Sequence, residues 1–105
     1  MCKVKTSTAF EVAFYNFKAF VGDWSPMDYN APTFKDFDEA CRYAESKLDD
    51  FYKRAVESGE FEDVYTCQPE FDFWQMDVYY RMEGKRYSGA AYIYINPIVS
   101  CDYEF

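Results

Sequence analysis

The longest regular alternation of apolar and polar residues runs from Thr33 to Gly59. Apolar side chains recur there at steps of three and four, which places them on one stripe of a helix. Thr33 with Asp36, or Asp36 with Glu39, can cap its start after Pro32, and Gly59 can close it in a left-handed conformation. The pattern predicts a helix of about 22 residues with this stripe facing the core: Phe37, Ala40, Cys41, Ala44, Leu48, Phe51, Tyr52, Ala55 and Val56.

A strict two-residue alternation, typical of a half-buried strand, follows between residues 74 and 82. Gly84 lies where a tight turn over Met82–Lys85 needs a positive φ. A return strand over residues 86–96 should end at Pro97, and the tail 100–105 either frays or pairs at an edge. One face of this hairpin should meet the helix: Trp74, Met76, Val78, Tyr80, Met82, Ala91, Ile93 and Ile95.

Residues 9–21 fit two patterns. Phe10, Val12 and Phe14 alternate as in a strand, and the composition is aromatic and β-branched. A helical stripe also fits, with Thr8 and Glu11 as its capping box: Phe10, Ala13, Phe14, Phe17, Phe20 and Val21. We predict a strand with a register change near Asn16, and the helix stays open as the alternative.

The remaining segments have no strong period. Residues 1–8 read as a polar lead-in, and residues 22–33 as a loop whose Trp24, Met27 and Tyr29 cover one edge of the core. Residues 60–69 read as an irregular acidic segment anchored by Phe61, Val64 and Tyr65. The chain is therefore expected to form a single α+β domain over residues 1–105. Its elements follow in β-α-β-β order, with one long helix packed across an antiparallel sheet of three to four strands.

The second hairpin face should present Tyr79, Tyr92 and Tyr94 beside Asp77 and Arg81. Tyrosine is common at protein interfaces because it gives contact area at small entropic cost. A solvent-facing sheet surface also accepts tyrosine for its β-propensity alone. Both interpretations remain open from the sequence.

Charge is distributed unevenly along the chain. The net charge is −8, and residues 36–72 hold twelve acidic against four basic residues. Three i,i+4 pairs on the predicted helix have the acid first, which is the favourable order: Asp38–Arg42, Asp49–Lys53 and Asp50–Arg54. Direct nucleic-acid binding would need a basic footprint, which the sequence lacks, whereas an acidic surface attracts basic partners.

Targeting and redox features are sparse. No secretory h-region and no apolar run of membrane-spanning length is visible, so we expect a cytoplasmic protein without membrane contact. Four scattered cysteines are then free thiols, although an oxidising compartment would leave their pairing open: Cys2, Cys41, Cys67 and Cys101.

Catalytic patterns are also missing from the sequence. The chain has no histidine, no CxxC pair and no glycine-rich phosphate loop, and Glu60–Asp63 lacks EF-hand spacing. We therefore expect no enzymatic activity, no catalytic residue, no metal site and no cofactor.

The sequence favours a non-enzymatic interaction protein that binds a basic protein surface. If that surface normally holds nucleic acid, this chain would act as a nucleic-acid mimic. In composition it resembles the inhibitors that phages and mobile elements make against host nucleic-acid-binding defences, such as anti-CRISPR and antirestriction proteins. The predicted contacts are Asp49, Asp50, Glu57, Glu60, Glu62, Asp63, Tyr79, Tyr92 and Tyr94.

Two alternatives remain for the function. One is a small-ligand or regulatory domain with an aromatic pocket lined by Trp24, Tyr29 and Trp74. The other is a homo-oligomer subunit that pairs through the tyrosine-bearing sheet face or an open sheet edge.

Overall fold

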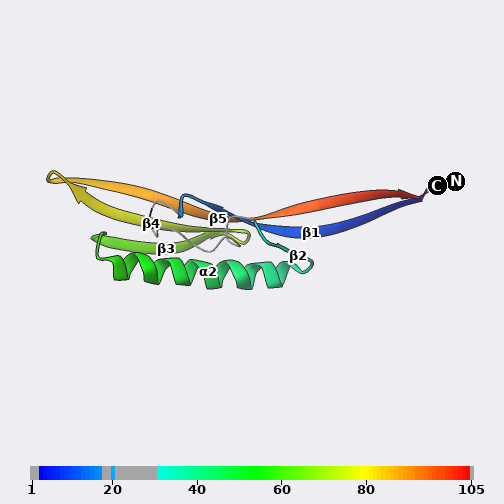
Figure 1. The fold of residues 1–105 in the computed structure, drawn as a ribbon, viewed down its shortest axis with the longest axis horizontal. Helices are drawn as coiled ribbons and strands as arrows, with labels where there is room; N and C mark the ends of the chain where they lie inside the picture. The colour runs from blue at the N-terminus through cyan, green and yellow to red at the C-terminus, as the bar shows by residue number, and fades with distance from the viewer. Residues whose placement is uncertain (1–2, 18–19, 21–30, 105) are drawn as a thin grey trace.

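The computed structural model describes residues 3–17, 20 and 31–104. Within this part, one long helix, α2 (Phe37–Ser58), lies along one face of an antiparallel sheet (Figure 1). The α+β class is confirmed, but the sheet has five strands rather than three to four, in the order β2-β1-β5-β4-β3. The strands are β1 (Lys3–Tyr15), β2 (Thr33–Phe34), β3 (Asp63–Glu70), β4 (Phe73–Met82) and β5 (Lys85–Glu104).

The ends of α2 are set by side-chain and backbone caps. The Asp36 carboxylate accepts a hydrogen bond from the Asp38 backbone N–H at 3.2 Å, so the helix uses the later of the two predicted starts. Gly59 adopts φ 70° and donates its N–H to the Val56 carbonyl at 3.3 Å, as predicted. Both caps satisfy backbone groups that have no partner inside the helix.

The predicted helix start at Thr33 is wrong because Thr33 and Phe34 form strand β2. They pair with Glu11 and Phe10 of β1. The Phe34 ring packs on Tyr43 of α2, with centroids 5.2 Å apart. These two residues therefore gain strand pairing and a packed ring before the chain turns into the helix.

Strand β1 settles the ambiguity of residues 9–21 for the part that is described. Residues 9–15 are strand, and the chain leaves it at Asn16, which has φ 66°. The Asn16 Nδ2 donates to the Ala90 carbonyl of β5 at 3.3 Å. The chain then turns back under the sheet, and the Phe17 ring packs against Phe51 of α2 with centroids 4.6 Å apart and an interplanar angle of 31°. Phe17 and Phe20, beyond this turn, are helical, so the strand prediction is confirmed for residues 9–15 and the helical alternative for these two later residues.

The polar lead-in predicted for residues 1–8 is wrong for residues 3–8, which are strand, and the strand end predicted at Pro97 is also wrong. Residues 3–15 pair with residues 92–104 without interruption, and Pro97 lies opposite Phe10. The Ile95 N–H donates to the Asp72 carbonyl, away from β1. Because N–H directions repeat every two residues, the Pro97 nitrogen also points away from β1, beyond the end of β4, and no ladder bond is lost.

The irregular segment predicted for residues 60–69 is also a strand for most of its length. β3 pairs antiparallel with β4, and Val64 lies opposite Val78. Residues 65–70 are exposed, so the strand has no apolar alternation by which it could be recognised. Phe61 and Val64 do pack against the core, but Tyr65 is 55% exposed and does not anchor the segment.

The β4–β5 hairpin agrees with the prediction. Glu83 and Gly84 have φ values of 54° and 80°, which suits a two-residue hairpin turn. The predicted inner face is buried against α2, apart from half-buried Tyr80 and exposed Met82 at the turn. The residues of this inner face that are fully enclosed are Trp74, Met76, Val78, Ala91, Ile93 and Ile95.

The helix stripe meets this face through small and large side chains. Alanines at three of its buried positions allow close approach to the sheet, while Phe51 and Leu48 fill the wider spaces. Tyr52 and Val56, predicted in the stripe, lie at its margin and are 37% and 51% exposed. The buried helix residues are Ala40, Ala44, Leu48, Phe51 and Ala55.

The molecule is elongated, with extents of 70 × 27 × 21 Å. Beyond the helix, β1 and β5 continue as a two-stranded ribbon (Figure 1). No helix of the described residues is long and apolar enough to cross a membrane. Cys41 and Cys67 are free thiols. The predicted loop with Trp24, Met27 and Tyr29 lies outside the described residues.

Candidate protein-interaction surface

Two predicted contact residues on α2 form ion pairs within the helix. Asp49 lies 2.9 Å from the Lys53 Nζ, and Asp50 lies 3.3 Å from an Arg54 guanidinium nitrogen. The hydrogen bond from Lys53 to Asp49 raises the pKa of Lys53. Their side chains stay largely in solvent, so these pairs contribute little stability, but they reduce the negative field on this side of the helix.

Glu62 and Asp63, also predicted as contacts, are neutralised by arginines from the β4–β5 hairpin. Arg81 pairs with Glu62 through its Nε, and Arg86 lies 3.6 Å from Glu62 and 2.9 Å from Asp63. The sequence gives no local signal for these pairs, because Glu62 and Arg81 are 19 residues apart and Asp63 and Arg86 are 23 residues apart.

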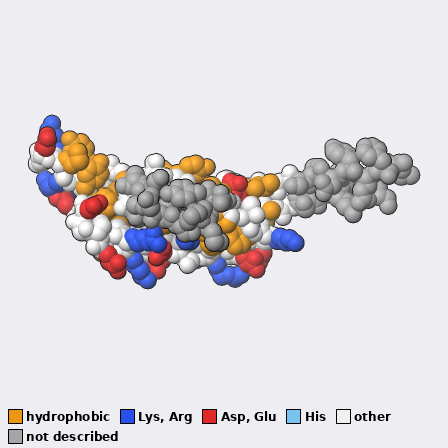
Figure 2. Space-filling model, in the orientation of Figure 1, with side chains coloured by type: hydrophobic (Ala, Val, Ile, Leu, Met, Phe, Trp, Pro, Cys, Tyr) orange, Lys and Arg blue, Asp and Glu red, His pale blue; other side chains and the backbone are white. Residues whose placement is uncertain are grey.

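Glu57 and Glu60 form no ion pair with any described residue. On α2 itself, six acidic residues are accompanied by four basic ones. Figure 2 shows red and blue side chains interleaved along the side where the helix lies. Between Glu60 and Asp72 the sequence has five acidic residues and no basic one, and in the fold two of the five pair with arginines of the hairpin. The helix presents mixed charge instead of a continuous acidic stripe.

The three predicted tyrosines lie on the sheet face opposite α2, here called the outer face. Tyr94 stacks on Phe73 with centroids 4.5 Å apart and interplanar angle 9°. Tyr92 lies 5.6 Å from Phe73, and Tyr15 meets Tyr94 edge-on at 5.6 Å. We call these four rings, Tyr15, Phe73, Tyr92 and Tyr94, the aromatic cluster. Such pairings hold each ring in a defined orientation.

A second group of side chains surrounds Tyr79 on the same face. Tyr65 of β3 meets the Tyr79 ring edge-on at 5.9 Å. The Arg86 guanidinium lies 4.5 Å from the centroid of the Tyr79 ring while it pairs with Asp63. Sequence reasoning missed Tyr15, Tyr65 and Phe73 as members of this surface. Their position in the strand alternation could have placed Tyr15 and Phe73 there, but not Tyr65 of the unrecognised strand.

Asp77 lies between the two groups. Its Oδ1 accepts a hydrogen bond from the Gln75 side chain at 2.7 Å, and the carboxylate has no ion-pair partner among the described residues. The residue directly opposite on β5 is Ala90, which presents only a methyl group beside Asp77. The half-buried Asp77 carboxylate, which pairs with no cation of the described residues, therefore lies between Tyr79 and Tyr92.

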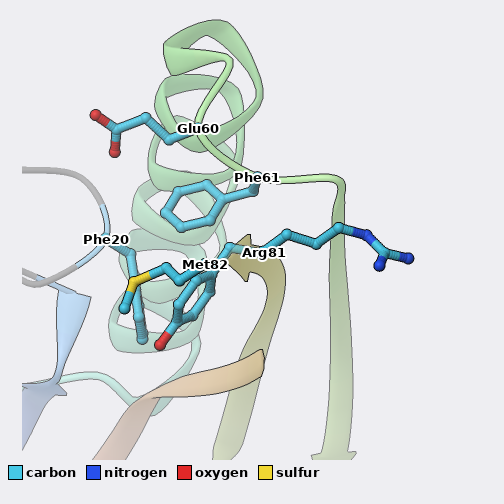
Figure 3. A pocket seen from close by; sticks show the side chains of 6 residues that line it. Phe20, Glu60, Phe61, Arg81 and Met82 are labelled. Atoms are coloured by element: carbon cyan, nitrogen blue, oxygen red, sulfur yellow. The ribbon is translucent and has the colours of Figure 1, made fainter. Parts of the chain in front are cut away.

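A cavity of about 400 Å³ lies at the hairpin end of the molecule (Figure 3). Phe20, Phe61 and Met82 converge on it, whereas Glu60 and Arg81 direct their charged groups away from it. Polar groups therefore do not converge as a small-ligand site requires. Of the predicted pocket residues, Trp74 is 2% exposed in the core, and Trp24 and Tyr29 lie outside the described residues.

No group of three or more potential metal ligands occurs within the part of the chain that the structure describes. Comparison with known proteins found no matching protein family, no similar curated protein and no similar solved structure. The fold and the outer face thus define an α+β protein with an aromatic sheet surface that no other element of the described residues covers, and its function has to be argued from that surface.

Proposed function

We propose that this protein is a non-enzymatic interaction module that binds a basic surface of a partner protein through its outer face. The observation that carries the proposal is the aromatic surface on strands β1, β3, β4 and β5, which no other described element covers. Tyr15 and Tyr65 are 49% and 55% exposed there. Oriented tyrosine rings of this kind suit protein recognition because few rotamers are lost on binding.

The charge supports a basic partner. The chain carries −8 overall, and Asp77 on the outer face has no ion pair among the described residues; neither do Glu57 in the last turn of α2 and Glu60 just after it. A cationic partner surface would be attracted at long range and would supply counter-charges on contact. In the finer form of the proposal, that surface normally binds nucleic acid, and the protein acts as an inhibitor that occupies it, as anti-CRISPR and antirestriction proteins do.

The proposal is tested by affinity capture with three baits. These are the wild-type protein, the double variant Tyr92→Ser/Tyr94→Ser and the control Tyr52→Ser, which alters an exposed tyrosine on α2. We expect a basic protein to be retained by the wild type and the control, lost with the double variant, and released by added nucleic acid and by high salt. Equal retention on all three baits, or no retention on any, would refute binding through the outer face.

A second candidate function, an oligomer subunit, is favoured by the ribbon of β1 and β5. Within residues 3–9 and 98–104, the described strands pair only with each other, which leaves both outer edges open. Open edges are templates for pairing with another chain. Sedimentation velocity decides between the two candidate functions, because a protein that stays monomeric across the micromolar range is not an oligomer subunit.

A further inference from the structure

The outer face already binds one arginine side chain, and this internal contact indicates what it recognises. The Arg86 guanidinium lies 4.5 Å from the centroid of the Tyr79 ring, while its Nη2 donates to the Asp63 carboxylate at 2.9 Å. A planar guanidinium can stack on an aromatic ring and still donate in-plane hydrogen bonds to a carboxylate. Tyrosine and aspartate on adjacent strands thus form an arginine site.

The same two residue types recur farther along the hairpin without an arginine. Asp77 lies diagonally across from Tyr92, because Tyr92 is opposite Gln75 and Ala90 is opposite Asp77. Diagonal neighbours on antiparallel strands are about 7–8 Å apart, a span that one guanidinium can bridge. Ala90 presents only a methyl group on the face between them, and the Asn16 side-chain amide donates a hydrogen bond to the Ala90 carbonyl.

From this repetition we propose that the place over Ala90, between Asp77 and Tyr92, is a binding site for an arginine side chain of the partner. The guanidinium would pack against Tyr92 and donate to Asp77, whose Oδ1 is held by Gln75 at 2.7 Å. The inference rests on the proposed function, and it narrows the basic partner to one that presents arginine. The protein's own Arg81 and Arg86 pair with Glu62 and Asp63, so they do not occupy the place between Asp77 and Tyr92.

Arginine is favoured over lysine for a physical reason. A lysine ammonium is a compact, strongly hydrated charge that gains little from a ring face, whereas guanidinium is weakly hydrated and planar. An anionic ligand is disfavoured because no cation of the described residues pairs with Asp77 and the chain carries −8. The site is therefore expected to discriminate between two cations of equal charge, which a diffuse acidic surface would not do.

The test compares two synthetic peptides, (Arg-Gly-Gly)4 and (Lys-Gly-Gly)4, by calorimetric titration of the full chain at moderate salt. We expect the arginine peptide to bind about tenfold more tightly than the lysine peptide. Asp77→Asn should weaken the arginine peptide about tenfold. Asp49→Asn, which removes the same charge from α2, should change it less than twofold. Thermal melts confirm that each variant is folded.

A second variant separates shape from charge. Ala90→Val enlarges the side chain between Asp77 and Tyr92 without changing the net charge. It should reduce the affinity for the arginine peptide about tenfold and leave the affinity for the lysine peptide unchanged. Equal affinities for the two peptides, or equal losses with Asp77→Asn and Asp49→Asn, overturn the arginine site and leave the proposed function standing. If neither peptide binds even at low salt, the proposed attraction to a basic partner fails as well.

Discussion

Replacing Phe51 by alanine removes the side chain on which α2, β1 and the segment after β1 meet. Phe51 is completely buried, and its ring lies 4.6 Å from that of Phe17 and 5.9 Å from that of Phe14. Truncating a buried phenylalanine costs about 3–5 kcal/mol, because apolar contact is lost and a cavity remains. Each aromatic pair contributes about 0.5–1.5 kcal/mol beyond the burial of its apolar area, so we expect Phe51→Ala to lower the unfolding free energy by about 4 kcal/mol.

This loss is large against the total stability of such a domain. A chain of 105 residues has an unfolding entropy of about 0.22 kcal/mol/K near 60 °C, so 4 kcal/mol lowers Tm by about 18 °C. Total unfolding free energies are about 5–15 kcal/mol, and the alanine variant therefore approaches the limit of folding. The milder Phe51→Leu replacement should cost about 1.5 kcal/mol and lower Tm by about 7 °C.

Thermal unfolding followed by circular dichroism measures both variants against a surface control on the same helix. Val56→Ala truncates a side chain that is 51% exposed, and it should change Tm by less than about 3 °C. The packing argument is refuted if Phe51→Ala lowers Tm no more than Val56→Ala does. A decrease for Phe51→Leu as large as that for alanine would also contradict it, since leucine fills most of the space.

Three further outcomes are expected. Gly89→Ala should destabilise the fold by about 1–3 kcal/mol in chemical denaturation, because its Cβ would lie 2.6 Å from the Phe20 ring; an unchanged midpoint would contradict that contact. Cys67, which is exposed, should be alkylated before half-buried Cys41 at pH 8 in peptide-mapping mass spectrometry, and the reverse order would be inconsistent with the structure. Burial and then the nearby acidic groups raise the pKa of Cys41 above 9.0. The protonated Cys41 thiol therefore contributes fully to the unfolding free energy below pH 9, and this contribution is lost as pH rises through the folded-state pKa. Between pH 8 and pH 11, the unfolding free energy of Cys41→Ala should accordingly decrease less than that of the wild type.

The comparison of sequence and structure shows where local patterns are informative. The period of α2 and the alternation in β4 and β5 were readable because one face of each element is buried along most of its length. β3 was missed because it is an edge strand exposed from residue 65 onward, where burial imposes no alternation. The helical stripe in residues 9–21 was wrong for residues 9–15 and right for Phe17 and Phe20, because the chain changes from strand to helix at Asn16.

The candidate surface was predictable only in outline. Alternation alone placed Tyr79, Tyr92 and Tyr94 on one face of the hairpin. The pairing of Glu62 with Arg81 and of Asp63 with Arg86 depends on β3 lying beside β4, and the sequence carries no local signal for that. The same strand pairing decides which acidic side chains remain without a cation.

By itself, the sequence determined an α+β class, the extent of one amphipathic helix, one hairpin with its buried face, and a net charge of −8. These follow from short-range periodicity and composition, which depend on residues a few positions apart. Tertiary structure alone decided the five-stranded order, the long β1–β5 pairing through Pro97, and the position of Asp77 between tyrosines and opposite Ala90. Those features arise when strands distant in the chain share backbone hydrogen bonds, and the free energy of that pairing is not encoded in any single local pattern.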